Sequence, residues 1–141
     1  MAELVRIGAI ARLDPRPEDE LRVWREDLGR GEIDDPEVTQ RRLENHERGR
    51  AVIVRLDLFA DLAGPHGRLE RLDGATVAGI WFYVRQDEEN VAHAEEMVRE
   101  NLGLLRADLL EHGLAVDVGA LEKMPVRVEI ASDLSRALGV G

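Results

Sequence analysis

Hydrophobic and polar positions alternate along parts of the chain, which is typical of strands with one buried face. The clearest run covers 50–62, where one face holds Val52, Val54, Leu56 and Leu58. The segment 125–131 also alternates strictly, and Pro125 at its start favours an edge strand because proline has no N–H to donate. Residues 3–13 are rich in β-branched side chains and are predicted as a further strand, with a helix as the alternative.

A hairpin and one long helix are expected between 68 and 113. Asp73-Gly74 is a strong turn signal because both residues tolerate positive φ, and it would join strands over 68–72 and 75–84. The hydrophobic spacing then changes to three and four, which predicts a helix over about 87–112. Its expected buried stripe contains Val91, Ala94, Val98, Leu102, Leu105 and Leu109. Gly103 inside this helix marks close packing or a bend, and a short strand over 114–118 is expected to follow.

Two short helices are predicted between the strands over 3–13 and 50–62, at 17–28 and 36–48. Pro17 and Pro36 suit the first helical position, and Gly29 and Gly49 suit the C-terminal caps. The order of elements indicates an α+β fold. We expect an antiparallel or mixed sheet of four to six strands, with the long helix packed across it and the two short helices at the N-terminus. The 141 residues are the size of a single domain, which we assign to 1–141.

Charge and composition narrow the classes of function. The chain has 19 basic and 29 acidic residues, a net charge of −10, so a nucleic-acid partner is not expected. An acidic inhibitor or mimic that binds a basic partner is one alternative. The chain has no cysteine, which excludes disulfides and thiolate metal sites. Neither a signal peptide nor an apolar stretch of about 20 residues is recognisable, so we expect a soluble cytoplasmic protein that does not enter membranes.

The histidines are the candidates for chemistry. His93 lies near Glu89 and Glu96 at a spacing found in metal sites, although the same residues fit a solvated helix face better. His66 lies in a loop beside a strand end. A small enzyme or ligand-binding domain with a pocket near His66 or His93 is therefore an alternative function. We predict no catalytic residue, metal ligand or cofactor.

The most informative surface candidate is one face of the strand 75–84. Trp81, Tyr83 and Arg85 share this face, and aromatic residues and arginine are enriched where proteins bind each other. We predict these three residues as a binding site. The alternative is that Trp24 and its helix cover the face and form a second core.

Residues 51–121 resemble the C-terminal domain of flagellar hook-length control proteins. The resemblance is carried by Leu56-Asp-Leu58 in the strand and by the helix end, in which the leucines at 102, 105 and 109 precede Gly113-Leu114. It implies a non-enzymatic module that contacts the export apparatus. The prediction is accordingly a small protein-interaction or assembly module, whose partner is another protein or a second copy of the chain.

Overall fold

The computed structural model describes residues 3–139, which form four strands, six α-helices and one 3-10 turn. The strands are β1 (Glu3–Leu13), β2 (Ala51–Ala63), β3 (Leu69–Tyr83) and β4 (Val126–Ile130). The helices are α1 (Pro17–Arg30), α2 (Pro36–Glu47), α3 (Asp87–Glu100), α4 (Leu102–Glu111), α5 (Val118–Glu122) and α6 (Ser132–Ala137), and the 3-10 turn is η1 (Pro65–Gly67).

The strands form one mixed sheet in the order β3-β2-β1-β4. β1, β2 and β3 are antiparallel neighbours, whereas β4 lies parallel to β1 at the opposite edge from β3. A parallel neighbour is available to β1 because the helices α3 to α5 return the chain across the sheet before β4 begins. The predicted α+β class, with an antiparallel or mixed sheet of four to six strands, is confirmed.

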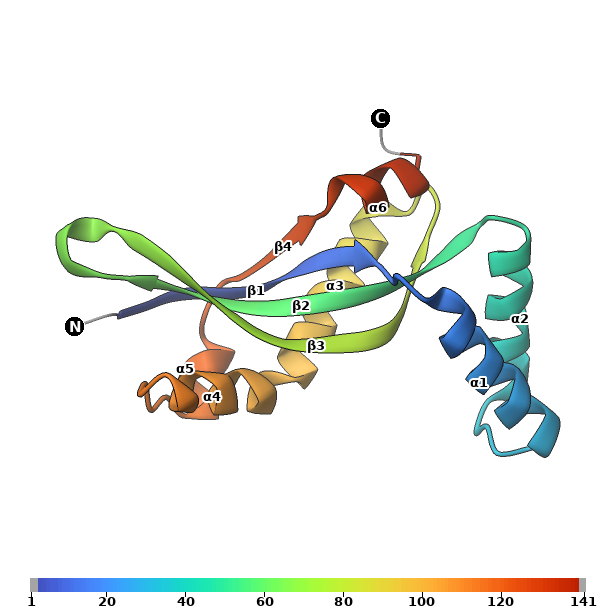
Figure 1. Cartoon of the computed structure of the whole chain (residues 1–141), viewed down its shortest axis with the longest axis horizontal. Coiled ribbons are helices and arrows are strands. Elements are labelled where there is room, and N and C mark those ends of the chain that lie inside the picture. Colours follow the sequence, from blue (N-terminus) through green and yellow to red (C-terminus); the bar gives the residue numbers. More distant parts are fainter. Residues whose placement is uncertain (1–2, 140–141) are drawn as a thin grey trace.

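The two faces of the sheet are covered unequally. Figure 1 shows α3 and α4 behind the sheet, the α1–α2 hairpin projecting from one end, and the β2–β3 hairpin extending beyond the other. The main core lies between the sheet and α3–α4 and contains Ile7, Val54, Leu56, Phe82, Val98, Leu105 and Leu109. The opposite face of the sheet carries charged residues along its middle. Helices α1 and α2 pack against this face at one end only (Figure 1).

The expected single helix over 87–112 is wrong, because the chain breaks at Asn101. Asn101 has φ −116° and ψ 25°, outside the helical range, and its side-chain amide donates to the carbonyl of Met97 at 2.7 Å. The break turns α4 away from α3 (Figure 1). The predicted stripe is buried on both sides of the break from Ala94 to Leu109, whereas Val91 at its start is half-buried and lies outside the main core. Gly103 is not the cause, since it lies inside α4 with open space around it. A one-residue break leaves the hydrophobic spacing unchanged, so the pattern does not reveal it.

The expected turn at Asp73-Gly74 is also wrong. β3 runs through it unbroken, and the β2–β3 hairpin turns at η1 instead. Phe59 pairs with Asp73 and Asp57 with Thr76, so two residues of β3 form a bulge opposite one residue of β2. The Ala75 N–H is free to donate to Asp108 of α4, at 2.8 Å. A Cβ at Gly74 would lie 2.6 Å from the same carboxylate, so this glycine permits the contact between helix and strand.

Two smaller expectations near helix ends also differ from the structure. Residues 114–118 form no strand; Asp117 instead caps α5 by accepting from the Ala120 N–H at 2.7 Å. Helix α1 ends at Gly31, in the left-handed conformation with φ +69°, whereas Gly29 lies inside the helix. The predicted N-terminal helices and the predicted edge strand β4 are confirmed.

Gly8 of β1 pairs with Phe59 of β2, and the Phe59 ring lies so close to it that no larger residue fits. A Cβ there would collide with the carbonyl oxygen of Arg127 on β4 and lie 2.6 Å from the Phe59 ring. We expect Gly8→Ala to lower the free energy of unfolding by about 1–3 kcal/mol, because a backbone atom cannot move aside as a side chain can. Urea denaturation measures the change. Gly29→Ala is the control: nothing lies within 4 Å of a Cβ at that position, so it should be neutral or slightly stabilising. Equal effects of the two variants would contradict the packing at Gly8.

Candidate functional site

Two of the three predicted binding residues, Tyr83 and Arg85, line a pocket of about 630 Å³. We call it the arginine pocket, because Arg41 of α2, Arg50 of the α2–β2 connection and Arg85 of the β3–α3 connection all line it. Asn45, Tyr83 and Gln86 supply its other polar side chains. The pocket is partly open to solvent, and its volume lies within the usual range of about 300–1,000 Å³ for ligand sites.

Trp81, the third predicted residue, lies in a second core instead. Its side chain is 4% exposed and stacks on Trp24 of α1, with ring centroids 5.0 Å apart. The other buried members of this second core are Leu21, Leu43, Ala51 and Ile53. For Trp81, therefore, the alternative of coverage by α1 is the one the structure shows. Tyr83 is half-buried and Arg85 is exposed.

The C-terminus of α2 brings Arg50 to the arginine pocket. Gly49 has φ +70°, and the Arg50 N–H donates back to the Asn45 carbonyl at 2.8 Å, as in a Schellman cap. The chain then enters β2, where Ala51 pairs with Tyr83. The Arg50 carbonyl accepts from the Val84 N–H at 2.9 Å. Arg50 therefore sits across from Val84, the neighbour of Tyr83 in the chain. Arg41 and Asn45, four residues apart, share one face of α2.

Asn90 fixes the other side of Tyr83. Its side chain, on a residue only 4% exposed, accepts from the Tyr83 N–H at 2.9 Å and donates to the Tyr83 carbonyl at 2.8 Å. Asn90 thus takes the place of a neighbouring strand at the free edge of β3. The sequence analysis missed this residue, because an asparagine near the start of a polar helix reads as surface. The only signal in the sequence that could have indicated this role is that Asn90 lies near the start of the helix that directly follows the strand.

Arg85 follows in a strained backbone conformation. Its φ is +63°, a left-handed value that side-chain-bearing residues adopt at a cost of roughly 1–2 kcal/mol. The Gln86 N–H closes the turn by donating to the Tyr83 carbonyl at 3.3 Å. The turn aims Arg85 at the arginine pocket rather than along the strand.

The three arginines have no acidic partner among residues 3–139, and no carboxylate lines the arginine pocket, although the chain has 29 acidic residues. Guanidinium groups are donors only and always charged, and the remaining polar wall residues can also donate. Neighbouring positive charges repel one another, and a bound anion removes that repulsion. The arrangement is therefore suited to anions.

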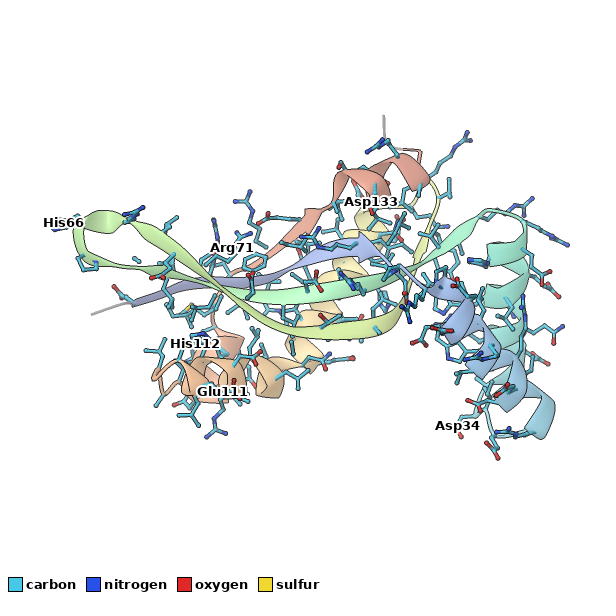
Figure 2. All side chains as sticks on the ribbon, in the orientation of Figure 1. Asp34, His66, Arg71, Glu111, His112 and Asp133 are labelled. Atoms are coloured by element: carbon cyan, nitrogen blue, oxygen red, sulfur yellow. The ribbon has the colours of Figure 1, made fainter. Side chains whose placement is uncertain are left out.

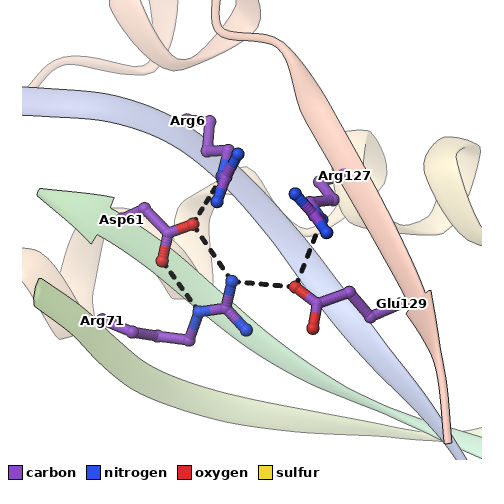
Figure 3. A network of polar contacts seen from close by, with 5 residues as sticks. All are labelled: Arg6, Asp61, Arg71, Arg127 and Glu129. Atoms are coloured by element: carbon purple, nitrogen blue, oxygen red, sulfur yellow. Dashed lines mark hydrogen bonds and ion pairs between the residues drawn. The ribbon is translucent and has the colours of Figure 1, made fainter. Parts of the chain in front are cut away.

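A separate charged cluster, which we call the sheet network, lies on the sheet face away from α3. It joins Arg6, Asp61, Arg71, Arg127 and Glu129, from all four strands (Figure 3). Arg71 donates to Asp61 at 2.8 Å, reaches Glu129 at 2.8 Å and lies over the Phe59 ring at 3.7 Å. Burial opposes ionisation of Asp61, yet hydrogen bonds from Arg71 and Arg6 hold its pKa below the usual range. Each charge here has a partner, so the sheet network stabilises the sheet rather than offering a ligand site.

The candidate histidines lie outside the arginine pocket. His66 is exposed at the tip of the β2–β3 hairpin (Figure 2), and His93 is half-buried on α3. Within the described chain, no group of three or more histidine, aspartate or glutamate side chains is placed to hold a metal ion.

No helix between residues 3 and 139 is long and apolar enough to cross a membrane.

Comparison of the chain with protein-family models, curated proteins and solved structures finds no match. The resemblance of residues 51–121 to hook-length control proteins therefore stays a prediction. The class of protein is defined by the fold alone: a small α+β domain with a mixed four-stranded sheet.

Proposed function

We propose that the protein is a non-enzymatic interaction module, and that it binds an anionic group of a protein partner between Arg41, Arg50 and Arg85. The observation that carries the proposal is the convergence of three arginines without acidic partners around Tyr83. Arginine and tyrosine are the residue types that most often dominate binding energy at protein interfaces. A guanidinium also binds a carboxylate or phosphate through two parallel hydrogen bonds, which gives orientation as well as affinity.

The charge of the whole chain favours a single anionic group over a polyanion. The net charge is −10, so a nucleic-acid backbone would be repelled by most of the surface while only a few phosphates could reach the arginine pocket. A protein partner can present one anionic group locally and avoid that repulsion. The resemblance to hook-length control proteins would place such a partner in the export apparatus, and we keep this as part of the proposal.

Thermal unfolding in different anions tests the proposal. We expect citrate or sulfate, compared with chloride at the same ionic strength, to raise the Tm of the native protein. An anion at ten times its Kd adds about 1.4 kcal/mol, or roughly 3–5 °C for a domain of this size. The double variant Arg50→Ala, Arg85→Gly should lose this gain. Glycine is chosen at 85 because it adopts positive φ without strain, so the variant separates loss of binding from loss of stability.

Arg68→Ala is the control for the loss of a surface arginine that is unpaired in the described chain. Arg68 is exposed on the β2–β3 hairpin and is likewise outside the ion pairs of the described chain. Its removal lowers the positive charge by one without touching the arginine pocket, and the anion effect should persist. If citrate and sulfate stabilise the double variant as much as the native protein, the anions act elsewhere and the proposal is wrong.

A further inference from the structure

The charge of the arginine pocket exceeds what a carboxylate can balance. A carboxylate carries one negative charge and two oxygens, and one guanidinium already satisfies it in a two-bond arrangement. Two arginines would then stay unpaired beside it. A phosphomonoester carries about −1.5 to −2 charges at neutral pH and three acceptor oxygens. Each of its terminal oxygens can accept from a different arginine of the pocket, so it fits the set Arg41, Arg50 and Arg85 better.

Beside the arginine pocket lies a shallow hollow along α2, which we call the groove along α2. This second hollow, of about 490 Å³, shares Arg41 with the arginine pocket and is lined further by Pro36, Glu37, Gln40 and Glu44. All these side chains are exposed, and α2 projects from the end of the sheet (Figure 1). Such open hollows cannot bury the 70–90% of a small ligand's surface that ligand sites usually bury. A chain segment lying along α2 can fill both hollows, whereas a free phosphate would occupy only the first.

The second hollow has the opposite charge from the first. Glu37 and Glu44 line it, and neither belongs to an ion pair of the described residues. Glu37 precedes Arg41 by four residues, one helical turn, which is a rise of about 6 Å. An extended chain covers that distance in about two residues. A segment with its phosphate at Arg41 would therefore place a basic side chain beside Glu37 when that residue lies two or three positions away.

We infer that the arginine pocket and the groove along α2 bind a phosphorylated segment of a protein partner, with a lysine or arginine two or three residues from the phosphorylated side chain. This inference rests on the proposed function and specifies the anionic group that it requires. Arginine clusters are a general means of recognising phosphorylated peptides, and the neighbouring carboxylates add discrimination by charge. The second ionisation of a phosphomonoester lies near pH 6, so binding should strengthen as the pH rises through that value.

A degenerate peptide pool tests the inference without knowledge of the partner. Each peptide carries one fixed phosphoserine flanked by random positions, and a twin pool carries serine instead. We expect the native protein to retain the phosphorylated pool at least tenfold more than its twin, with lysine and arginine enriched two or three positions to one side. The double variant Arg50→Ala, Arg85→Gly should abolish retention, while Arg68→Ala should not. Glu37→Gln should leave retention of the phosphorylated pool in place but remove the enrichment of basic residues.

The outcomes distinguish this inference from the proposed function. If citrate and sulfate stabilise the native protein through the arginine pocket but the two pools are retained equally, the anion site stands and the phosphorylated segment is wrong. If free O-phosphoserine competes as well as a selected peptide, the groove along α2 contributes nothing and the segment is again wrong. If neither anions nor phosphorylated peptides act through the arginine pocket, both proposals fail.

Discussion

Replacing Trp81 with alanine is expected to lower the free energy of unfolding by about 3–5 kcal/mol, the usual cost of removing a large buried aromatic side chain. Trp81 is 4% exposed and lies between the sheet and the two N-terminal helices, where it stacks on Trp24. The variant leaves a cavity in a small core that few other residues can fill. Urea denaturation followed by far-UV circular dichroism measures the loss, and the fluorescence of Trp24, the only other tryptophan, reports its exposure to water.

The same variant should also weaken the arginine pocket. Arg41 and Asn45 are carried by α2, and α2 is held against the sheet through Leu43 in the second core. Once the second core is disrupted, Arg41 is no longer fixed relative to Arg85, and the rise in Tm with citrate should shrink. Val23→Ala is the control, since Val23 is on α1 but 46% exposed, and should change stability by less than about 0.5 kcal/mol. A loss below 1 kcal/mol for Trp81→Ala would show that other contacts hold the helices.

Sequence patterns predicted elements well where one face of the element is buried and the other is wet. β1, β2, β4 and both N-terminal helices fall within a few residues of their predicted positions. The patterns failed to predict breaks and bulges, where the backbone changes direction but the spacing of hydrophobic residues does not change. The break at Asn101 preserves the spacing of the hydrophobic stripe. The bulge at Gly74-Ala75 begins at the glycine that the predicted turn at Asp73-Gly74 would also use. Which strand pairs with β1 in parallel is likewise a matter of long-range packing, for which local patterns carry no signal.

The arginine pocket could be predicted only in part. Tyr83 and Arg85 were singled out because the pattern placed both on one face of a strand over 75–84. The strand ends at Tyr83 and Arg85 lies in the turn after it, yet both line the pocket. Arg41 and Arg50 come from another part of the chain, and only the pairing of Ala51 with Tyr83 brings them close. Trp81 illustrates the converse limit, since a strand pattern tells which residues share a face but not what covers it. The three predicted residues therefore have two different roles. Trp81 packs against the N-terminal helices in the second core, whereas Tyr83 and Arg85 line the arginine pocket.

Replacing Asp61 with asparagine should destabilise the protein by about 2–3 kcal/mol at neutral pH. The Asp61 side chain is 4% exposed and lies between Arg6, at 2.5 Å, and Arg71, at 2.8 Å. Asparagine keeps the shape but removes the negative charge between the two guanidinium groups, so Arg6 loses its carboxylate partner and Arg71 keeps only Glu129. Both arginines are about 30% exposed, and water can partly solvate them, which places the expected loss at the lower end for a broken buried pair. Urea denaturation at pH 7 gives the value.

The pH dependence shows whether charge is the cause. The pKa of folded Asp61 lies below its ordinary value, so its ionised form stabilises the folded state above the unfolded pKa, and this stabilisation disappears as the pH falls through the folded pKa. The pKa of Glu129 is lowered in the same direction, chiefly by its hydrogen bond from Arg71. The difference in stability between native protein and Asp61→Asn should therefore persist down to about pH 4 and shrink below it. Glu129→Gln, at the more exposed end of the sheet network, should show the same trend with a smaller amplitude. If the difference in stability instead stays constant from pH 7 to pH 3, the loss comes from disturbed packing at position 61. The charge of Asp61 would then not be what holds the Arg71 side chain in place.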